Sequence, residues 1–191
     1  MPLVTDEYRR ARRAQLLDAA KRCFVRQGFH ATSMKDVLSE AGMSAGAAYG
    51  YFSSKDELIL AVAEENIGQV AAELQALAGE AASHTPASAL AQILEMISLR
   101  TVSDDFAKMA VIVWSEAIRN PALRARVLGL AGQYRETFAT LWSAAEPRPT
   151  SEGQTTGAIA TMAVVGYILQ LALGESVAVS EFIEPLLTRR A

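Results

Sequence analysis

The chain has 191 residues, of which 51% are hydrophobic and 20% are charged, and its formal net charge is −3. This composition is typical of a globular protein that can bury its own core, and it excludes a largely disordered chain. The charge is unevenly distributed: residues 1–53 hold 8 Lys and Arg against 5 Asp and Glu, whereas residues 54–191 hold 10 against 16. We expect only the basic first part to meet a polyanion.

The first predicted element is an amphipathic helix over residues 7–27. Apolar side chains recur there at helical spacing, with Arg and Lys at many of the other positions. Gly28 predicts a left-handed cap at the end of this helix. Phe29 is expected to fold back toward Phe24, in the hydrophobic contact that often accompanies such a cap.

Two short helices are expected next, separated by a turn at Gly42. Ser33 and Asp36 stand three residues apart, which is the spacing of a capping box at the start of the first short helix. Ser44 can cap the second, which we expect to span about residues 44–52. A helix, a tight turn on glycine and a second short helix within about 20 residues are typical of the helix-turn-helix, which lays its second helix in the major groove of DNA.

The rest of the chain has the pattern of longer helices. Ser54 with Glu57 predicts a capping box at the start of the first of them. The expected helices span residues 55–82, 86–102, 104–119, 121–145, 151–173 and 179–188. No segment shows sustained period-two alternation, so we expect an all-α chain of about nine helices.

One uncharged run, residues 153–174, approaches the length of a membrane span. It contains several Thr and Gln residues, and no Lys or Arg lies next to it to anchor it at a membrane surface. We therefore interpret it as a helix buried on most sides, in the core or in a subunit interface. The single cysteine, Cys23, and first residues that lack an apolar core favour a reducing cytoplasm.

A specific resemblance covers residue 24 to about residue 62, and its signature lies in residues 32–62, "TSMKDVLSEAGMSAGAAYGYFSSKDELILAV". A threonine-rich helix start, AG-hydrophobic-S, Y-x-Y-F and K-x-E-L follow in this order, and the stretch resembles the signature of the TetR-type bacterial transcriptional regulators. The resemblance implies a three-helix DNA-binding domain at residues 1–53 and a larger helical domain at residues 54–191 that binds an effector. It also implies a homodimer formed through the helices at about 121–145 and 151–173.

The function that the resemblance implies is that of a ligand-responsive repressor, which binds a palindromic operator in double-stranded DNA and is released by a small molecule. By family position, the DNA-binding residues would be Ser44, Ala45, Gly46, Ala47, Tyr49, Gly50 and Tyr51 on the recognition helix, and Lys55 at the start of the next helix. Ala45 and Gly50 replace side chains of the common family pattern that could form hydrogen bonds. The choice between DNA sequences would therefore depend on Ser44, Tyr49, backbone groups and DNA shape.

Thr32 and Ser33 are expected to contact a phosphate for a physical reason. They lie at a predicted helix N-terminus, where hydroxyls, free backbone N–H groups and the helix dipole all favour an anion. Capping of the helix alone is the alternative role for both residues.

Four arginines crowd the first turns of the first predicted helix, where cations oppose the helix dipole unless a counter-charge is present. They are Arg9, Arg10, Arg12 and Arg13. Phosphate would supply that counter-charge, so we predict an arm that contacts the DNA backbone. A solvated charged face, softened by Asp6 and Glu7, is the alternative.

The larger domain offers eight candidates for the lining of an effector pocket. They are Met96, Phe106, Met109, Trp114, Tyr134, Phe138, Trp142 and Tyr167. As a group they suit an apolar effector, although each of them could instead be ordinary core.

Two other classes of protein fit the sequence less well. An enzyme is disfavoured because neither His30 nor His84 has a second ligand at metal-binding spacing, and because the chain has no phosphate-binding loop. We expect no cofactor, no metal and no catalytic residues. A helical small-molecule-binding or interaction module without specific DNA binding stays open as the alternative, and the basic first part of the chain argues against it.

Overall fold

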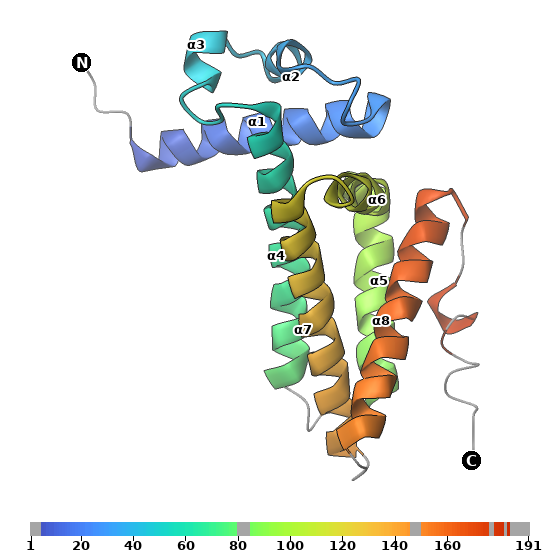
Figure 1. Cartoon of the computed structure of the whole chain (residues 1–191). Helices are drawn as coiled ribbons and strands as arrows, with labels where there is room; N and C mark the ends of the chain where they lie inside the picture. The colour runs from blue at the N-terminus through green and yellow to red at the C-terminus, as the bar shows by residue number, and fades with distance from the viewer. Residues whose placement is uncertain (1–4, 80–84, 146–149, 176–177, 182, 184–191) are drawn as a thin grey trace. The chain divides into compact units, whose positions relative to one another are not determined.

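The structure is a computed structural model, and it describes residues 5–79, 85–145, 150–175, 178–181 and 183 (Figure 1). These residues contain helices and no strand, so the all-α prediction is confirmed. The helices are α1 (Asp6–Gln27), α2 (Met34–Ala41), α3 (Ala45–Ala48), α4 (Lys55–Gly79), α5 (Pro86–Asp104), α6 (Phe106–Ala117), α7 (Pro121–Ala145) and α8 (Thr150–Ala172). Of the last predicted helix, residues 179–181 and 183 are helical, and the remainder lies outside the described residues.

The chain divides into two compact units, Met1–Glu65 and Asn66–Ala191. The first unit includes the first turns of α4, where Glu65 lies 3.1 Å from the ammonium of Lys21 on α1. The sequence-based boundary at residues 53 and 54 falls before this helix begins, and it stays a prediction of where the DNA-binding domain ends.

In the first unit, α1 buries one face of its helix. The side chains on this face are almost fully buried: Leu16, Leu17, Ala19, Ala20, Cys23 and Phe24. The ring of Phe24 lies 5.4 Å from that of Phe29 between centroids, so the predicted fold-back of Phe29 is confirmed. Gly28 has a positive φ of 81° as predicted, but its ψ of 162° lies outside the left-handed helical region.

The third helix is shorter than predicted. We expected a helix over residues 44–52, whereas α3 spans only Ala45–Ala48 and continues as a turn through residue 51. Two glycines lie in this stretch, and glycine loses more backbone freedom than other residues when it enters a helix. The amides of Tyr51 and Phe52 both donate to the carbonyl of Ala48, at 2.9 and 3.1 Å, which closes the turn.

The start of α4 differs in detail from a capping box. Ser54 Oγ accepts the backbone N–H of Glu57 at 3.1 Å, as predicted. The Glu57 carboxylate, however, accepts from the N–H and the hydroxyl of Ser53, at 2.7 and 2.8 Å, rather than from Ser54. These bonds hold the pKa of Glu57 below its usual value.

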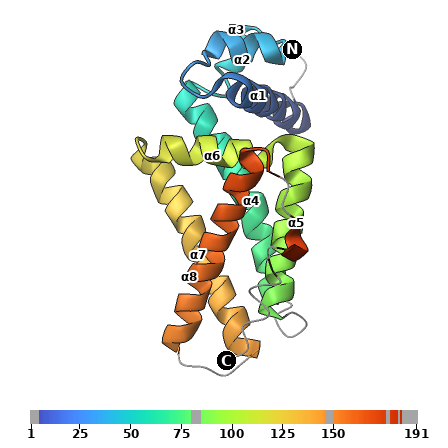
Figure 2. The ribbon, with the colours of Figure 1, turned by 90° about the vertical axis from the view of Figure 1, so that its right-hand side faces the viewer.

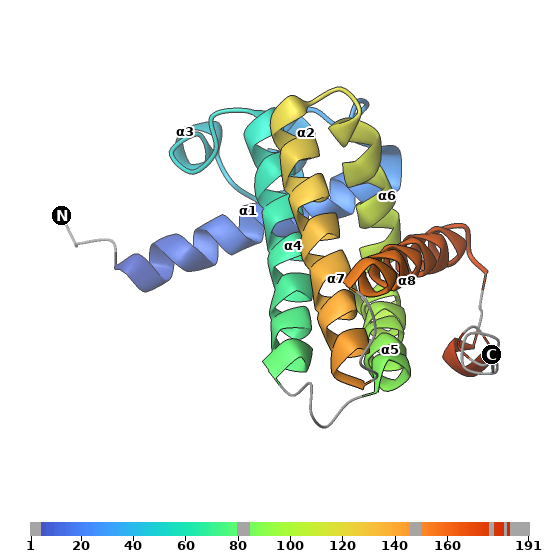
Figure 3. The same cartoon turned by 60° about the horizontal axis from the view of Figure 1, so that its bottom comes forward.

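The second unit packs helices α5 to α8 around one apolar core. α7 and α8 pack against each other and cross at an angle (Figure 2, Figure 3). Their backbones approach closely at Gly157, where a Cβ atom would clash with the carbonyl oxygen of Arg135. Asp105 separates α5 from α6 in the left-handed conformation, with φ 55°, so the break lies just after the predicted one.

The described chain itself covers little of the uncharged run, so burial in its own core is not observed, and burial in a subunit interface stays a prediction. The helical segment 152–172 is long and apolar enough to cross a membrane, with a mean hydropathy of 1.5. Only 28% of its apolar stretch is buried. Four large apolar side chains on one side of α8 are exposed: Ile159, Met162, Val165 and Leu169. Their spacing of three to four residues places them on one helix face, so α8 carries an apolar stripe that its own unit does not cover.

Candidate nucleic-acid interface

The turn between α2 and α3 has the geometry of a helix-turn-helix. Gly42 ends α2 in the left-handed conformation, with φ 61° and ψ 34°, as the sequence predicts. The amide of Met43 donates to the carbonyl of Leu38 at 3.0 Å and closes the turn. At the other end of α2, Ser33 and Asp36 form the predicted capping box in full. Both ends of α2 are therefore fixed by local bonds that the sequence encodes.

The predicted recognition residues line an exposed surface at α3. Ser44, Ala45, Gly46, Ala47, Tyr49 and Gly50 are exposed, Tyr51 is half-buried, and Ala48 faces the core. The hydroxyl of Ser44 makes no capping bond, although this residue precedes the helix. A Cβ atom on Gly46 would meet nothing within 4 Å, so the space beside this residue is open. α3 thus offers a thin surface on which Ser44 and Tyr49 are the polar side chains.

The four arginines of α1 differ in how firmly they are held. Arg9 is exposed, and Arg10 donates to the carbonyl of Asp6 at 3.3 Å. Arg12 donates to the Tyr8 hydroxyl at 3.0 Å and to Gln15 Oε1 at 2.8 Å. The guanidinium of Arg13 lies 5.0 Å from the ring centroid of Phe52. None of the four forms an ion pair within 4 Å with a described residue, so no carboxylate balances their charge at that range.

The hydroxyl of Thr32, which was expected to contact a phosphate, is buried. Thr32 is 1% exposed, and its hydroxyl donates to the carbonyl of Gly28 at 2.7 Å. A buried hydroxyl with an internal acceptor is not available to a phosphate, so Thr32 holds the loop between α1 and α2 instead. Ser33 is exposed, but its hydroxyl donates to Asp36 Oδ2 at 2.7 Å and accepts the Asp36 amide at 3.2 Å. These bonds give Ser33 the capping role, which was the alternative to a phosphate contact.

Lys55 is also engaged inside the first unit rather than open to solvent. Its ammonium donates to the carbonyls of Phe29 at 2.8 Å, His30 at 3.3 Å and Thr32 at 2.8 Å. An ammonium has three donors, and three carbonyls surround this one. The expected phosphate contact therefore competes with a structural role, in which Lys55 ties the start of α4 to the loop before α2.

Two positioning contacts were missed by the sequence analysis. Gln15 on α1 donates to the last carbonyl of α2, that of Ala41, at 2.7 Å. Glu40 accepts from Arg22 at 2.7 Å and from Arg26 at 3.2 Å, and these bonds lower its pKa. Both contacts join α1 to the end of α2 just before the turn. No local pattern could have revealed them, because the partners are 14 to 26 residues apart.

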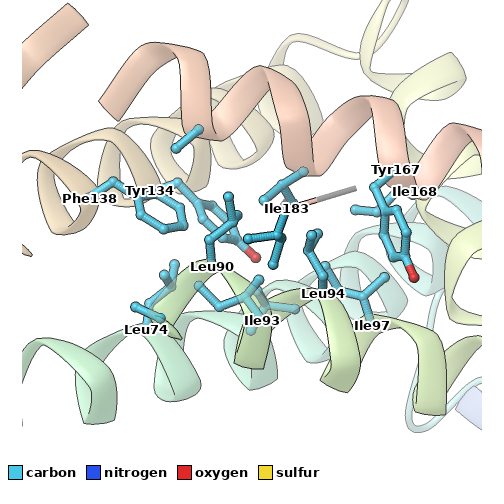
Figure 4. Close-up of a cluster of buried hydrophobic side chains, with 14 of the residues drawn as sticks. Leu74, Leu90, Ile93, Leu94, Ile97, Tyr134, Phe138, Tyr167, Ile168 and Ile183 are labelled. Carbon is cyan, nitrogen blue, oxygen red and sulfur yellow. The ribbon is translucent and has the colours of Figure 1, made fainter. Parts of the chain in front are cut away.

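The eight pocket candidates separate into core and margin. Tyr134, Phe138 and Tyr167 belong to the buried core of the second unit (Figure 4). Phe106 belongs to the same core, and Met96 and Trp114 pack against it. Met109 is buried outside this cluster, and Trp142 is half-buried. The hydroxyls of Tyr167 and Ser98 lie 2.6 Å apart, and Tyr134 stacks on Phe138 at 6.4 Å between centroids. Among the described residues, no group of three or more His, Cys, Asp or Glu could hold a metal ion.

The first unit has a left-handed turn before α3, an exposed α3 surface and a basic first helix, and a separate helical unit follows it. This arrangement is typical of helix-turn-helix DNA-binding regulators. Comparison with known proteins agrees with this geometry. Residues 16–62 match the family described as "Bacterial regulatory proteins, tetR family". The match runs from the middle of α1 to the first turns of α4.

The similarity to relatives extends beyond the DNA-binding unit. The chain is 31% identical over 153 residues to the HTH-type transcriptional regulator BetI of Rhizobium meliloti. The aligned region covers 78% of this chain and 73% of BetI. The chain is also 44% identical over 68 residues to the uncharacterized HTH-type transcriptional regulator YfiR of Bacillus subtilis. This aligned region covers 36% of this chain and 33% of YfiR. The chain thus matches only about a third of the length of YfiR. A solved TetR-like regulator from Rhodococcus sp. RHA1 superposes with a TM-score of 0.73 and 25% identity, over 92% of this chain and 91% of that one.

The protein belongs to the TetR family of bacterial transcriptional regulators.

Proposed function

We propose that this protein is a ligand-responsive repressor that binds a palindromic operator as a homodimer and is released by a small apolar molecule. The observation that carries the proposal is the exposed face of α3, which follows the left-handed turn at Gly42 and has few side chains. Such a face lets the backbone approach the bases and phosphates closely. The cytoplasm, where the DNA lies, is the compartment that this role requires.

Contacts with DNA would be of two kinds, those that recognise the base sequence and those that hold the phosphate backbone. Ser44 and Tyr49 carry the polar groups that can reach base edges or phosphates, while Ala45, Gly46, Ala47 and Gly50 let the two surfaces come close. Because few side chains can read the major groove directly, much of the sequence preference would come from DNA shape. Arg9 and Arg10 would hold the phosphate backbone, since they have no carboxylate partner within the described part of the unit.

Dimerisation would use the uncovered apolar stripe of α8. Met162, at the centre of the stripe, is 71% exposed, and Ile159 and Leu169 flank it. Exposed stripes of this kind mark interaction surfaces, and a second copy of the same helix can cover one about a two-fold axis.

Release by an effector requires two states of the second unit. An apolar ligand among Phe106, Tyr134 and Phe138 would stabilise one state of this core over the other. A ligand can shift the population only by its difference in affinity for the two states. α4 runs as one helix from Lys55, which holds the loop before α2, to Val70 and Leu74 in the second unit's core. We propose this helix as the link between the effector and the DNA-binding residues.

A gel-shift titration tests the proposal against the alternative of a helical binding module without specific DNA contacts. The purified protein is titrated onto duplexes from the region upstream of its own gene and onto shuffled duplexes of equal length, at several salt concentrations. We expect tighter binding to one upstream duplex, weakening steeply as salt rises. Equal affinity for upstream and shuffled DNA would favour the alternative.

A further inference from the structure

A polar cluster in the second unit has two buried donors with no partner in the part of the chain that the structure describes. The side chain of Arg100 on α5 is 17% exposed, and Asn66 on α4 is 9% exposed. Arg100 Nη1 and Asn66 Nδ2 are buried nitrogen atoms without a hydrogen-bond partner among the described residues. Buried polar groups are almost always hydrogen-bonded, because leaving one unpaired is costly. Two unpaired donors at one place therefore need an explanation.

The two donors are neighbours. Arg100 Nη2 donates to Asn66 Oδ1 at 3.3 Å, so Nη1 of the same guanidinium and Nδ2 of the same amide belong to one connected group. The guanidinium lies 4.4 Å from the ring centroid of Phe106, which holds it against the core. Its carboxylate partner is Asp104, at 3.1 Å, with a side chain that is 42% exposed. The inner side of the guanidinium thus has no anion of its own among the described residues.

The surroundings of this pair are apolar and aromatic. Phe106 and Tyr134 belong to the buried core, and Tyr134 stacks on Phe138. Burial raises the pKa of Tyr134, and the charge of Arg100 opposes this rise only in part, so the phenol stays protonated. A ligand beside this cluster would meet aromatic surface on its body and the two unpaired nitrogen donors at its polar end.

We propose that Arg100 and Asn66 bind the acceptor end of the effector, and that this end is a carboxylate on an apolar or aromatic skeleton. The proposal rests on the ligand-responsive function proposed above and adds the chemical class of the ligand. Guanidinium groups bind carboxylates through paired hydrogen bonds that are stronger than those to neutral acceptors. Because Asn66 lies on α4, a carboxylate held there acts directly on the helix that begins at Lys55.

Calorimetry and thermal unfolding of the full chain test this assignment. The probes are octanoate, decanoate and 3-phenylpropanoate, each compared with the primary alcohol of the same carbon skeleton. We expect at least one carboxylate to bind and to raise the unfolding temperature more than its alcohol does. If each carboxylate binds no better than its alcohol, or if none binds, the proposal is overturned.

Variants locate the effect on the proposed residues. Arg100→Met should weaken carboxylate binding by at least about tenfold and leave the alcohols unchanged, since it removes a charge-assisted bond and keeps an apolar stem. Asn66→Asp provides a second test if Arg100→Met folds poorly, because a carboxylate at this position pairs with Arg100 and repels the ligand. Lys108→Gln, which removes an exposed charge of the same unit, is the matched control and should bind the probes as the unaltered protein does.

The outcome is separable from that of the proposed function. Operator binding is measured by gel shift without any probe, whereas carboxylate binding is measured without DNA. Specific DNA binding combined with carboxylate affinity that Arg100→Met does not change overturns this inference and leaves the repressor proposal in place. Carboxylate binding that Arg100→Met weakens, in a protein that binds all DNA equally, supports the site and contradicts the repressor.

Discussion

Lys55 and Phe29 are joined by two contacts of different kinds. The Lys55 ammonium donates to the Phe29 carbonyl at 2.8 Å and lies 4.5 Å from the centroid of the Phe29 ring. The same ring packs on Phe24, so one cation connects the start of α4 to the end of α1. The family signature places Lys55 at the DNA, whereas these contacts give it a part in holding the DNA-binding unit together.

Replacing Lys55 by Met should therefore destabilise the protein before it affects DNA. We expect the free energy of unfolding to fall by about 1–2 kcal/mol, because three carbonyls lose a charged donor. Urea unfolding followed by circular dichroism measures this loss. Lys35→Met, at an exposed position of α2, is the matched control and should change stability little. A Lys55→Met protein of unaltered stability that binds operator poorly would assign the ammonium to phosphate instead.

A bulky side chain at position 46 should prevent operator binding without unfolding the protein. In Gly46→Leu the new side chain enters open space, so the fold should persist, while the backbone of α3 can no longer approach the groove. Gly68→Leu, at another exposed helical glycine with open space beside it, is the control and should bind operator normally. Gel shift and thermal unfolding are measured on both variants. Operator affinity retained by Gly46→Leu contradicts the close approach.

The arginines of α1 should determine much of the salt dependence of DNA binding. Replacing Arg9, Arg10, Arg12 and Arg13 by Ala should flatten the plot of log affinity against log salt, by about 0.9 for each phosphate that is no longer neutralised. Arg9→Ala with Arg10→Ala should account for most of this change, because Arg12 and Arg13 also hold Tyr8, Gln15 and Phe52. A slope equal to that of the unaltered protein would show that these arginines form only a solvated charged face.

Acid should weaken the first unit through its hydrogen-bonded carboxylates. Hydrogen bonds from Arg22 and then Arg26 lower the pKa of Glu40 below its ordinary value of 4.5, and bonds from Ser33 lower that of Asp36. A group with a lowered pKa in the folded state adds stability above its ordinary pKa and loses it as pH falls through the lowered value. The urea midpoint should therefore fall as pH drops below about 4.5, and less steeply in Glu40→Gln. Equal pH dependence in the two proteins would remove Glu40 from this account.

The apolar stripe of α8 should be required for the dimer. Met162→Glu places a charge in the middle of the proposed interface, which should shift the protein toward monomer. Val102→Glu is the matched control, because Val102 is 90% exposed on α5 and outside the stripe. Sedimentation velocity at several protein concentrations distinguishes the two species. If Met162→Glu sediments as the unaltered protein does, the dimer proposed through α8 is wrong.

The sequence predicted the elements that are specified by local chemistry. The capping box of Ser33 and Asp36, the turn at Gly42 and the bounds of α7 all follow from residue type and spacing, and the structure agrees with them. The length of α3 was overestimated, because two glycines made its helical pattern weaker than its spacing indicated. The roles of Thr32 and Lys55 could not be predicted, since their acceptors are backbone carbonyls that only the tertiary fold brings near. The sequence could not decide between core and interface for α8, because an apolar helix has the same sequence pattern in both places.

Selection of bound DNA from a pool of random duplexes tests the central claim most directly, because it assumes neither the operator nor the effector. The account predicts enrichment of an inverted repeat with half-sites about one helical turn apart, or a multiple of it. It also predicts that Gly46→Leu enriches nothing while Gly68→Leu enriches the same repeat. Enrichment of no sequence by the unaltered protein would contradict the account.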